Sequence, residues 1–304
     1  MKTAKTTIST ATLCVAALAC GNFTVHATGF TLGDASNYAV LYEGNGGNTL
    51  NYNNSLLTGN IGIGLTGKAQ LNGPGTITGN IAFSAANTGQ YSDSGVTVTG
   101  GVSYGIPTVT SALNTVNALS QTLGAEAAAA SAAGANTTIN GGGSVNVASG
   151  FSDVYGNKVF NVTGVSFPNG SFTIHGDGIH NVVFDIDLAV SFNGSIVLDG
   201  LTSDQVLFNI IGGNYTTLSG GHTLTISTSG LTTTGTFLDP NGDYQINHTV
   251  LDGRLFGGDT KNVSIVSGAE INAPLPSVPD AGSSLLLLSL GMGAVVAAKK
   301  KLIG

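Results

Sequence analysis

The feature that most constrains the fold is a short sequence repeat with a period near 20 residues. The tetrapeptide TGNI occurs at 58–61 and again at 78–81, and TGGV follows at 99–102. Each copy is flanked by short segments of alternating apolar and polar residues. A β-solenoid needs this pattern, because every coil places an apolar residue inward at the height of its neighbour's. Unless the recurrence is chance in a Gly/Thr/Asn-rich chain, it predicts a mainly β chain folded as a β-solenoid of the right-handed β-helix type.

The composition favours an ordered chain of short strands. Charged residues make up only 8% of the 304 residues, glycine accounts for 46, and Trp is absent. Such a composition is also found in disordered chains. Here, however, apolar residues that favour strands are spread evenly, as in NVVFDIDLAVSF and SIVLDGL. The body of about 250 residues is long enough to bury one sizeable core.

One segment, residues 108–135, has a helical pattern instead. Alanine fills much of it, and its larger apolar residues are spaced by three, three and four positions: Leu113, Val116, Leu119 and Leu123. This spacing places them on one face of a helix. Thr110 or Ser111 is expected to cap the start, and Gly134 to end it. We expect this long α-helix to pack alongside the solenoid with its apolar stripe inward.

The first 27 residues have the three parts of a secretory signal peptide. Two lysines come first, an apolar core follows at 13–19, and the segment ends in Val-His-Ala. We expect cleavage after Ala27. A lipoprotein signal is the alternative and would place the lipid on Cys20. The other cysteine, Cys14, also lies in this segment, so the exported body would carry neither a disulfide nor a free thiol.

The other end of the chain predicts a membrane segment. An uncharged, mostly apolar run of about 18 residues ends at Ala298, which is just long enough for a transmembrane helix. A buried C-terminal helix is the alternative, but the run has no polar face. Residues 281–304 are therefore expected to form a transmembrane helix with a basic cytoplasmic tail, preceded by a Pro-rich spacer with a motif at 274–280. The basic stop consists of Lys299, Lys300 and Lys301.

The charge of the body excludes some partners. Once both ends are set aside, four basic residues stand against fifteen acidic ones, so the body has a formal charge of −11. Such a surface repels nucleic acid and offers no phosphate-binding patch. It keeps an exported protein soluble and would attract divalent cations.

The C-terminal arrangement also resembles a known sorting signal. The motif Val278-Pro279-Asp280-Ala281-Gly282, with the apolar run and lysines after it, resembles the VPDSG-CTERM variant of the bacterial PEP-CTERM class. Ala281 stands where that variant usually has Ser. The resemblance implies that an exosortase-type membrane transpeptidase recognises the motif and cleaves near it. The protein would then be released or re-attached at the cell surface.

The body, residues 28–273, resembles two related families of surface proteins. Residues 108–271 are similar to the choice-of-anchor A domain in the helix, in VLFNI at 206–210 and in the segment beginning GTFLDPNG at 235. The stretch FTLGDASNYAVL at 30–41 and the segment TGNIGIG resemble the ice-binding-like family. That family has a β-solenoid with a helix packed alongside, so the resemblance implies a fold more than an activity.

The sequence contains few candidates for catalysis. Asp185 and Asp187 are spaced to share one face of a strand, as a hydrolase pair would. We expect instead that they form the solvated face of an amphipathic strand. His175 and His180 flank a Gly-rich turn whose geometry does not suit a zinc site. We therefore expect no catalytic residues and no enzyme activity.

No cofactor is expected, with one weak candidate for calcium. Asp239, Asn241 and Asp243 match the start of a D-x-N-x-D calcium loop. The glycine and glutamate that complete such a loop are missing. The same residue types are preferred in plain turns, which is the favoured interpretation.

The threonine-rich segments indicate the alternative functions. TVTVTG, TITG and TLTISTSGLTTTGT would align hydroxyl and methyl groups on a flat solenoid face, which would suit ice binding. Thr is also an ordinary residue of strand surfaces. We predict a structural or adhesive protein of the cell surface or extracellular matrix with a glycan or matrix ligand. Ice binding is the alternative, and a polysaccharide-acting enzyme comes third.

Overall fold

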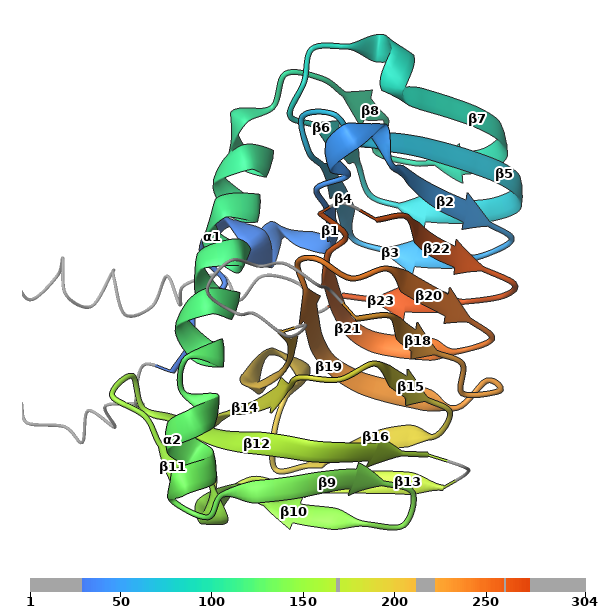
Figure 1. The fold of residues 1–304 in the computed structure, drawn as a ribbon. Helices are drawn as coiled ribbons and strands as arrows, with labels where there is room; N and C mark the ends of the chain where they lie inside the picture. The colour runs from blue at the N-terminus through green and yellow to red at the C-terminus, as the bar shows by residue number, and fades with distance from the viewer. Residues whose placement is uncertain (1–28, 168–169, 212–221, 260, 274–304) are drawn as a thin grey trace, which may run out of the picture.

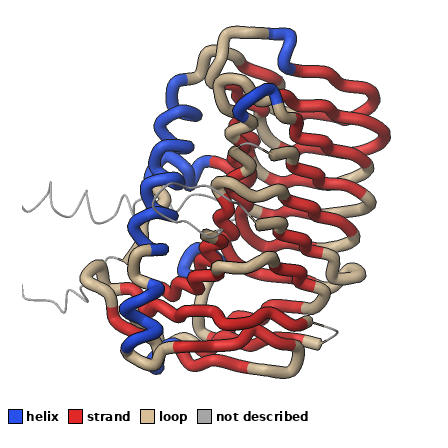
Figure 2. The backbone as a smooth tube through the Cα atoms, viewed as in Figure 1, coloured by secondary structure: helices blue, strands red, loops and turns tan. Residues whose placement is uncertain are grey.

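The computed structural model describes residues 29–273, apart from 168–169, 212–221 and 260. Over these residues the chain winds into the stacked coils of a β-solenoid, with a helix running along one side (Figures 1 and 2). A complete coil contributes three strand segments, and equivalent segments of neighbouring coils pair in parallel. The three stacks of segments form three faces. We name them the helix face, the amide face and the threonine face.

The helix face is the longest stack and runs from one end of the solenoid to the other. Its strands, in spatial order, are β8 (Val102–Ser103), β6 (Ile81–Phe83), β4 (Asn60–Ile63), β1 (Tyr38–Tyr42), the second halves of β21 (Val250–Gly257) and β19 (Thr232–Asp239), β17 (Val206–Ile210), β14 (Asn181–Ile186), β12 (Asn157–Ser166) and β9 (Asn136–Asn140). The short strand β11 (Phe151–Ser152) adds the antiparallel partner of β12.

The amide face is a second stack of parallel segments. It comprises the first halves of β7 (Tyr91–Val98) and β5 (Lys68–Thr78), then β2 (Thr49–Asn53), β22 (Val263–Val266), β20 (Tyr244–Asn247), β18 (Leu224–Ile226) and β15 (Val190–Phe192).

The threonine face completes the prism. It comprises the second halves of β7 and β5, then β3 (Leu56–Thr58), β23 (Glu270–Asn272) and the first halves of β21 and β19, followed by a separate three-stranded sheet of β16 (Ser195–Asp199), β13 (Ser171–His175) and β10 (Ser144–Asn146). Short 3₁₀ turns join some strands: η2 (Gly33–Asn37), η3 (Asn45–Gly47), η4 (Thr88–Gln90), η5 (Val147–Ser149) and η6 (Ser203–Gln205).

The order of the coils in space differs from their order in the sequence. The first coil, β1–β2–β3, lies in the middle of the stack. The next two coils are added on one side of it, and the helix then carries the chain to the far end. From there the coils return toward the middle, where the last one, β21–β22–β23, pairs with the first. Figure 1 shows this seam, where β22 and β23 lie beside β2 and β3.

The TGNI repeat marks one corner of the solenoid. Thr58 is in register with Thr78, and Ile61 with Ile81, so the two copies stack directly. A Cβ on Gly79 would lie 2.1 Å from the carbonyl oxygen of Gly59, which explains why the repeat requires glycine. The Asn60 side chain accepts a hydrogen bond from the backbone of the next coil and donates one to the coil before it. The period therefore predicted the fold correctly.

The helical segment is divided into α1 (Pro107–Gly124) and α2 (Ala127–Ala132). Pro107 occupies the first turn, where its fixed φ suits a helix start, so the predicted cap at Thr110 or Ser111 is wrong. Gly134 has a φ of +79° and follows α2, in agreement with the predicted stop. At 18 residues, α1 is about 27 Å long and packs against the helix face and η2.

The core lies between the three faces and contains an aromatic stack. Phe160, Phe184, Phe208 and Phe237 occupy equivalent positions on successive coils, with ring centroids 5.4, 5.2 and 4.8 Å apart and nearly parallel planes. All four side chains are at most 2% exposed. Offset stacking of this kind adds to the free energy gained from burial. The parallel pairing of the strands fixes the spacing of the coils, and the ring stack fills the core at the same repeat.

Candidate functional site

The helix face is covered by α1 and is not available to a ligand over most of its length. Val109, Leu113 and Val116 of α1 are at most 5% exposed. A buried polar network joins the helix to the sheet. Ser120 donates from its Oγ to Asn209 Oδ1 at 2.6 Å, and Asn209 Nδ2 contacts Asp185 Oδ1 at 2.8 Å.

The structure corrects the prediction for Asp185 and Asp187. Asp185 is 1% exposed beneath the helix, together with its neighbours Phe184 and Ile186, because both sides of β14 are covered. The expected solvated face therefore does not exist at Asp185. Asp187 lies beyond the end of β14 and is exposed, and its Oδ1 lies 3.5 Å from Nε2 of His222. The two carboxyl groups lie in different environments and do not form the paired acids of a hydrolase.

Two buried carboxyl groups have raised pKa values. Burial raises the pKa of Asp185 well above its usual range, since only Oδ1 accepts a hydrogen bond. Burial likewise raises the pKa of Asp239, whose Oδ1 accepts a hydrogen bond from the backbone N–H of Gly242 at 2.8 Å. Both groups are buried, Asp185 beneath α1, and neither reaches a surface on which a substrate would bind.

The weak calcium candidate forms a tight turn. Asp239 and Asn241 are buried, and Asp239 folds back onto its own loop. In the ranges that the structure describes, no group of three or more His, Cys, Asp or Glu side chains could hold a metal ion. His175 and His180 each contact a single carboxylate, Asp199 and Asp177 respectively, at 2.9 and 2.6 Å.

The amide face carries a continuous column of neutral polar side chains. Seven outward positions on successive strands are in direct register, and none is charged: Ser92, Gln70, Asn51, Ser264, Gln245, Thr225 and Ser191. The buried residues between them, such as Leu50 and Tyr52, fix the outward direction. At the usual strand spacing the column is about 29 Å long. The sequence prediction missed it, although Asn51, Gln70 and Ser92, and again Thr225, Gln245 and Ser264, recur at intervals close to the coil period.

The threonine face is more mixed. Thr97 and Thr76 continue into Leu56, Glu270, Val250 and Thr232 in one outward column. Thr78 and Thr58 continue into Asn272, Asp252 and Thr234 in the next. Two carboxylates therefore interrupt the middle of this face. Of the segment TLTISTSGLTTTGT, the residues Thr228, Thr233 and Thr236 are fully buried and are not part of an exposed face.

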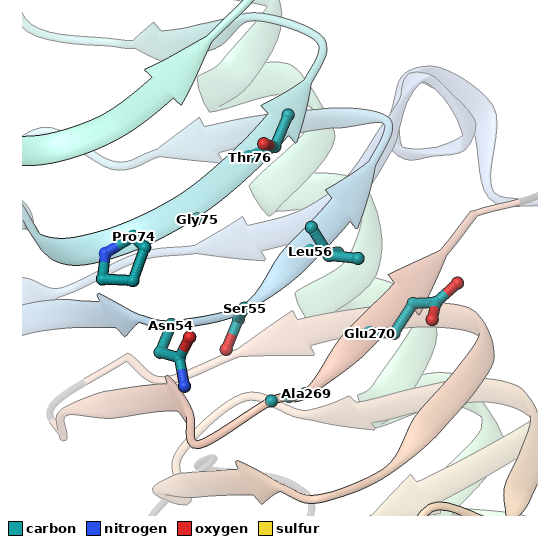
Figure 3. Close-up of a pocket in the computed structure, with 9 residues that line it drawn as sticks. Asn54, Ser55, Leu56, Pro74, Gly75, Thr76, Ala269 and Glu270 are labelled. Carbon is teal, nitrogen blue, oxygen red and sulfur yellow. The ribbon is translucent and has the colours of Figure 1, made fainter.

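A recess of about 400 Å³ opens at the corner between the amide and threonine faces (Figure 3). Three neighbouring coils line it with Asn54, Ser55, Leu56, Pro74, Gly75, Thr76, Gly268, Ala269 and Glu270. The same corner holds the four described non-glycine residues that have positive φ: Asn54, Ser229, His248 and Ser267. Each adopts a left-handed conformation that costs a side-chain-bearing residue about 1 kcal/mol or more.

The described body begins and ends on the side away from the amide face. Gly29 lies against α1, close to Asn157 and Asn181. Ala273 follows β23 at the corner between the threonine and helix faces, where its N–H donates to the carbonyl of Thr58 at 3.1 Å.

The predicted processing and sorting residues lie outside the described residues. These are Ala27, the motif Val278, Pro279, Asp280, Ala281 and Gly282, and the lysines Lys299, Lys300 and Lys301. The expected transmembrane helix at 281–304 lies there too. Within the described ranges, neither helix is long and apolar enough to cross a bilayer.

Comparison with known families identifies the class of protein. Residues 15–272 match the family of ice-binding-like adhesive domains, and the chain belongs to this family. This match includes the stretch for which the sequence resembled the choice-of-anchor A domain. Residues 277–302 match the VPDSG-CTERM motif, as predicted. The protein is thus an ice-binding-like adhesive domain followed by a surface-sorting signal. No curated protein matches the chain.

Solved structures confirm the fold. An ice-binding protein from the Antarctic ascomycete Antarctomyces psychrotrophicus has a TM-score of 0.50 and 17% identity, over 81% of this chain and 98% of that one. An ice-binding protein with antifreeze activity from an Arctic yeast has a TM-score of 0.50 and 15% identity, over 84% of this chain and 98% of that one. An ice-binding protein from an Antarctic bacterium, Flavobacteriaceae, has a TM-score of 0.52 and 17% identity, over 81% and 48%. The family and these structures are described as adhesive or ice-binding, and none as an enzyme.

Proposed function

We propose that this protein is an exported adhesive or structural component of the cell surface or extracellular matrix, without catalytic activity, which holds a glycan or another matrix ligand. The observation that carries the proposal is the seven-residue column of neutral side chains on the amide face. Hydroxyl and amide groups in a regular row both donate and accept hydrogen bonds, as a polyhydroxylated ligand requires.

The charge of the protein favours neutral ligands. The body has a formal charge of −11, so a strongly anionic polymer would be repelled. The amide column itself adds no charge. Many weak, regularly spaced hydrogen bonds to one polymer would together give firm attachment through multivalency.

Export and sorting fit this function. The proposed route begins with cleavage of the signal peptide after Ala27 and a temporary membrane anchor at 281–304. An exosortase-type transpeptidase would then act at the motif 278–282, whose match to the VPDSG-CTERM motif supports this step. Because Ala273 lies at the corner opposite the amide face, a protein held through its C-terminal segment would present that face outward.

Ice binding is the second candidate, and the part of the threonine face formed by β7, β5 and β3 favours it. Thr97, Thr76, Thr78 and Thr58 form a small regular group of hydroxyl and methyl groups. Glu270 and Asp252 then interrupt the array, and a carboxylate binds its own hydration shell tightly. The uninterrupted amide face therefore supports adhesion more strongly than the threonine face supports ice binding.

The first test measures retention of the protein, recovered from the surface of its exporting cell, on insoluble cellulose, chitin and pectate. We expect retention on a neutral polymer and none on the anionic pectate. Gln245→Glu places a charge in the middle of the amide column and should lower retention roughly tenfold, the loss of one or two good hydrogen bonds. The matched control is Thr232→Glu on the threonine face, which should retain binding. Equal retention by both variants would contradict the proposal.

The second test is thermal hysteresis with inspection of ice-crystal shape. The adhesive function predicts ordinary, unshaped crystals. Shaped crystals that become ordinary in a Thr58→Tyr variant would replace the proposal with ice binding. A parallel measurement of Asp280→Ala in the exporting cell, by fractionation, tests the sorting step, for which we expect protein to remain in the membrane fraction.

A further inference from the structure

The recess between the amide and threonine faces results from a difference in chain length between neighbouring coils. Tyr52 is in register with Leu71 and Ile265, and Leu56 is in register with Thr76 and Glu270. Three residues separate Tyr52 from Leu56, whereas four residues separate the corresponding pairs in the coils on both sides. The middle coil therefore turns the corner more tightly, and the two flanking coils project beyond it as the walls of the recess.

The floor of this recess is rigid. Tyr52 is fully buried, and its hydroxyl lies 2.6 Å from the carbonyl oxygen of Ser55 and 2.8 Å from that of Thr76. Gly75 leaves no room for a side chain, since its Cβ would lie 2.9 Å from the Ser55 carbonyl oxygen. The left-handed turn at Asn54 is held by a 2.7 Å hydrogen bond from the N–H of Gly268. A preformed site of this kind loses little entropy when it binds a ligand.

The lining combines a small apolar surface with a few polar groups. Leu56 is 52% exposed at one end of the recess, and Pro74 lies at the other end, near Asn54 (Figure 3). Glu270 lines the recess on the other wall, and its side chain extends away from Asn54 and Pro74 (Figure 3). Its Oε1 accepts a hydrogen bond from Nδ2 of Asn272 at 2.9 Å. In its column the carboxylate has apolar neighbours on both adjacent coils, Leu56 and Val250. The volume of about 400 Å³ lies in the range of small-ligand sites.

We infer that this recess is a binding site for a pyranose unit of a neutral polysaccharide, such as a chain end. The apolar face of the sugar ring would pack on Leu56 and Pro74. Ring hydroxyls would donate to the carboxylate of Glu270, which makes strong, charge-assisted hydrogen bonds. Asn54 and Thr76 would bind the remaining hydroxyls. The nearby carboxylate and the net negative charge of the body exclude an anionic sugar.

This inference rests on the proposed adhesive function and adds a specific contact to it. The recess adjoins the amide face, because Asn54 directly follows Asn53 at the end of β2. A polymer that lies along the amide column would reach the recess at the corner. The column would then give length-dependent adhesion, and the recess would select the type of sugar.

The experiment is calorimetric titration of the protein, recovered from the cell surface, with cellohexaose, chitohexaose, laminarihexaose and an anionic oligogalacturonate of the same length. We expect one neutral hexaose to bind and the anionic one not to bind. Glu270→Gln removes the charge, and Leu56→Ala removes most of the apolar side chain. Each should weaken binding about tenfold, as expected for one charge-assisted hydrogen bond or one apolar contact.

The matched control is Asp252→Asn, which removes a carboxylate from the same face outside the recess and should leave the affinity unchanged. All three positions reach the surface, and circular dichroism checks that each variant remains folded. One outcome is that Glu270→Gln and Leu56→Ala bind the hexaose as tightly as the parent, and the parent is still retained on the polymer. In that case the recess is not the binding site, but the adhesive function stands. If neither hexaose nor polymer binds, both proposals fail. Binding of a tri-lysine peptide in place of the sugars, lost in Glu270→Gln, would also overturn this inference.

Discussion

The helix face and the amide face are built by the same coils, yet their outward side chains have opposite environments. Asn209 on the helix face is fully buried and contacts both Ser120 and Asp185. Gln245 on the amide face occupies an equivalent outward position and is exposed. The difference is produced by α1, which covers one face and leaves the other open. An amide side chain on a solenoid is thus structural or available for binding according to what covers its face.

The largest expected effect comes from truncating one amide on each face. Asn209→Ala leaves Ser120 and Asp185 buried without their partner and should lower the free energy of unfolding by about 3 kcal/mol. Gln245→Ala removes an exposed side chain and should change it by less than about 0.5 kcal/mol. Urea denaturation of both variants makes the measurement. Similar losses at the two positions would contradict the contrast between the faces.

A smaller effect concerns the charge of Asp185. Its pKa is raised in the folded state by burial, so between the ordinary and the raised pKa the folded protein binds more protons than the unfolded chain. Stability therefore falls as the pH rises through this window and is regained at acid pH. Asp185→Asn should stabilise the protein at pH 7 by about 1–2 kcal/mol, as expected when a buried charge is removed.

The amide of the variant would also face Asn161, its register partner, and so extend a row of asparagines along the helix face. Unfolding free energies of the parent and the variant, measured from pH 4 to pH 8, should converge at the acid end. Asp239 has a pKa raised in the same direction, so part of the slope should remain in the variant. Asp252→Asn, at an exposed carboxylate, is the control and should keep the slope of the parent.

The smallest effect concerns the strained backbone at the corner between the amide and threonine faces. His248 has a φ of +44° and an exposed side chain. His248→Gly removes the left-handed strain and should raise the free energy of unfolding by about 0.5 kcal/mol, after the greater flexibility of glycine in the unfolded chain is subtracted. Thermal melts measure the change. A destabilised variant would mean that the His248 side chain makes a contact that offsets its strain.

The sequence was sufficient to predict the coil stack and the position of the helix. The period could be recognised because Gly79 leaves no room for a side chain at that corner and Asn60 forms hydrogen bonds to both neighbouring coils. The apolar stripe of the helix was also correct in outline, since Leu113, Val116 and Leu123 are buried. The coil repeat and the helix stripe depend on contacts between residues that are close in sequence or one coil apart. Such contacts produce a regular spacing of residue types, which the sequence shows directly.

Other features depend on contacts between distant segments and were not predicted. The alternation around Asp185 suggested a solvated face, because a sequence pattern does not reveal that a remote helix covers the strand. The position of β1 between β4 and β21 follows from pairing across more than 200 residues, as in the register of Val40 with Leu255. The recess exists because the turn between Tyr52 and Leu56 is one residue shorter than the same turn in the two adjacent coils. This difference is found only when the three coils are aligned in register.

The meeting of the first and last coils in the middle of the stack has a mechanical consequence. A load applied at Ala273 is transmitted first to β23, which is paired on both sides, with β21 and with β3. Neither end of the solenoid is pulled directly, so the terminal coils are not peeled away one at a time. Force must instead shear a strand held between two neighbours at the centre of the molecule. A domain attached in this way would resist drag on the cell surface better than a stack of coils pulled from its last turn.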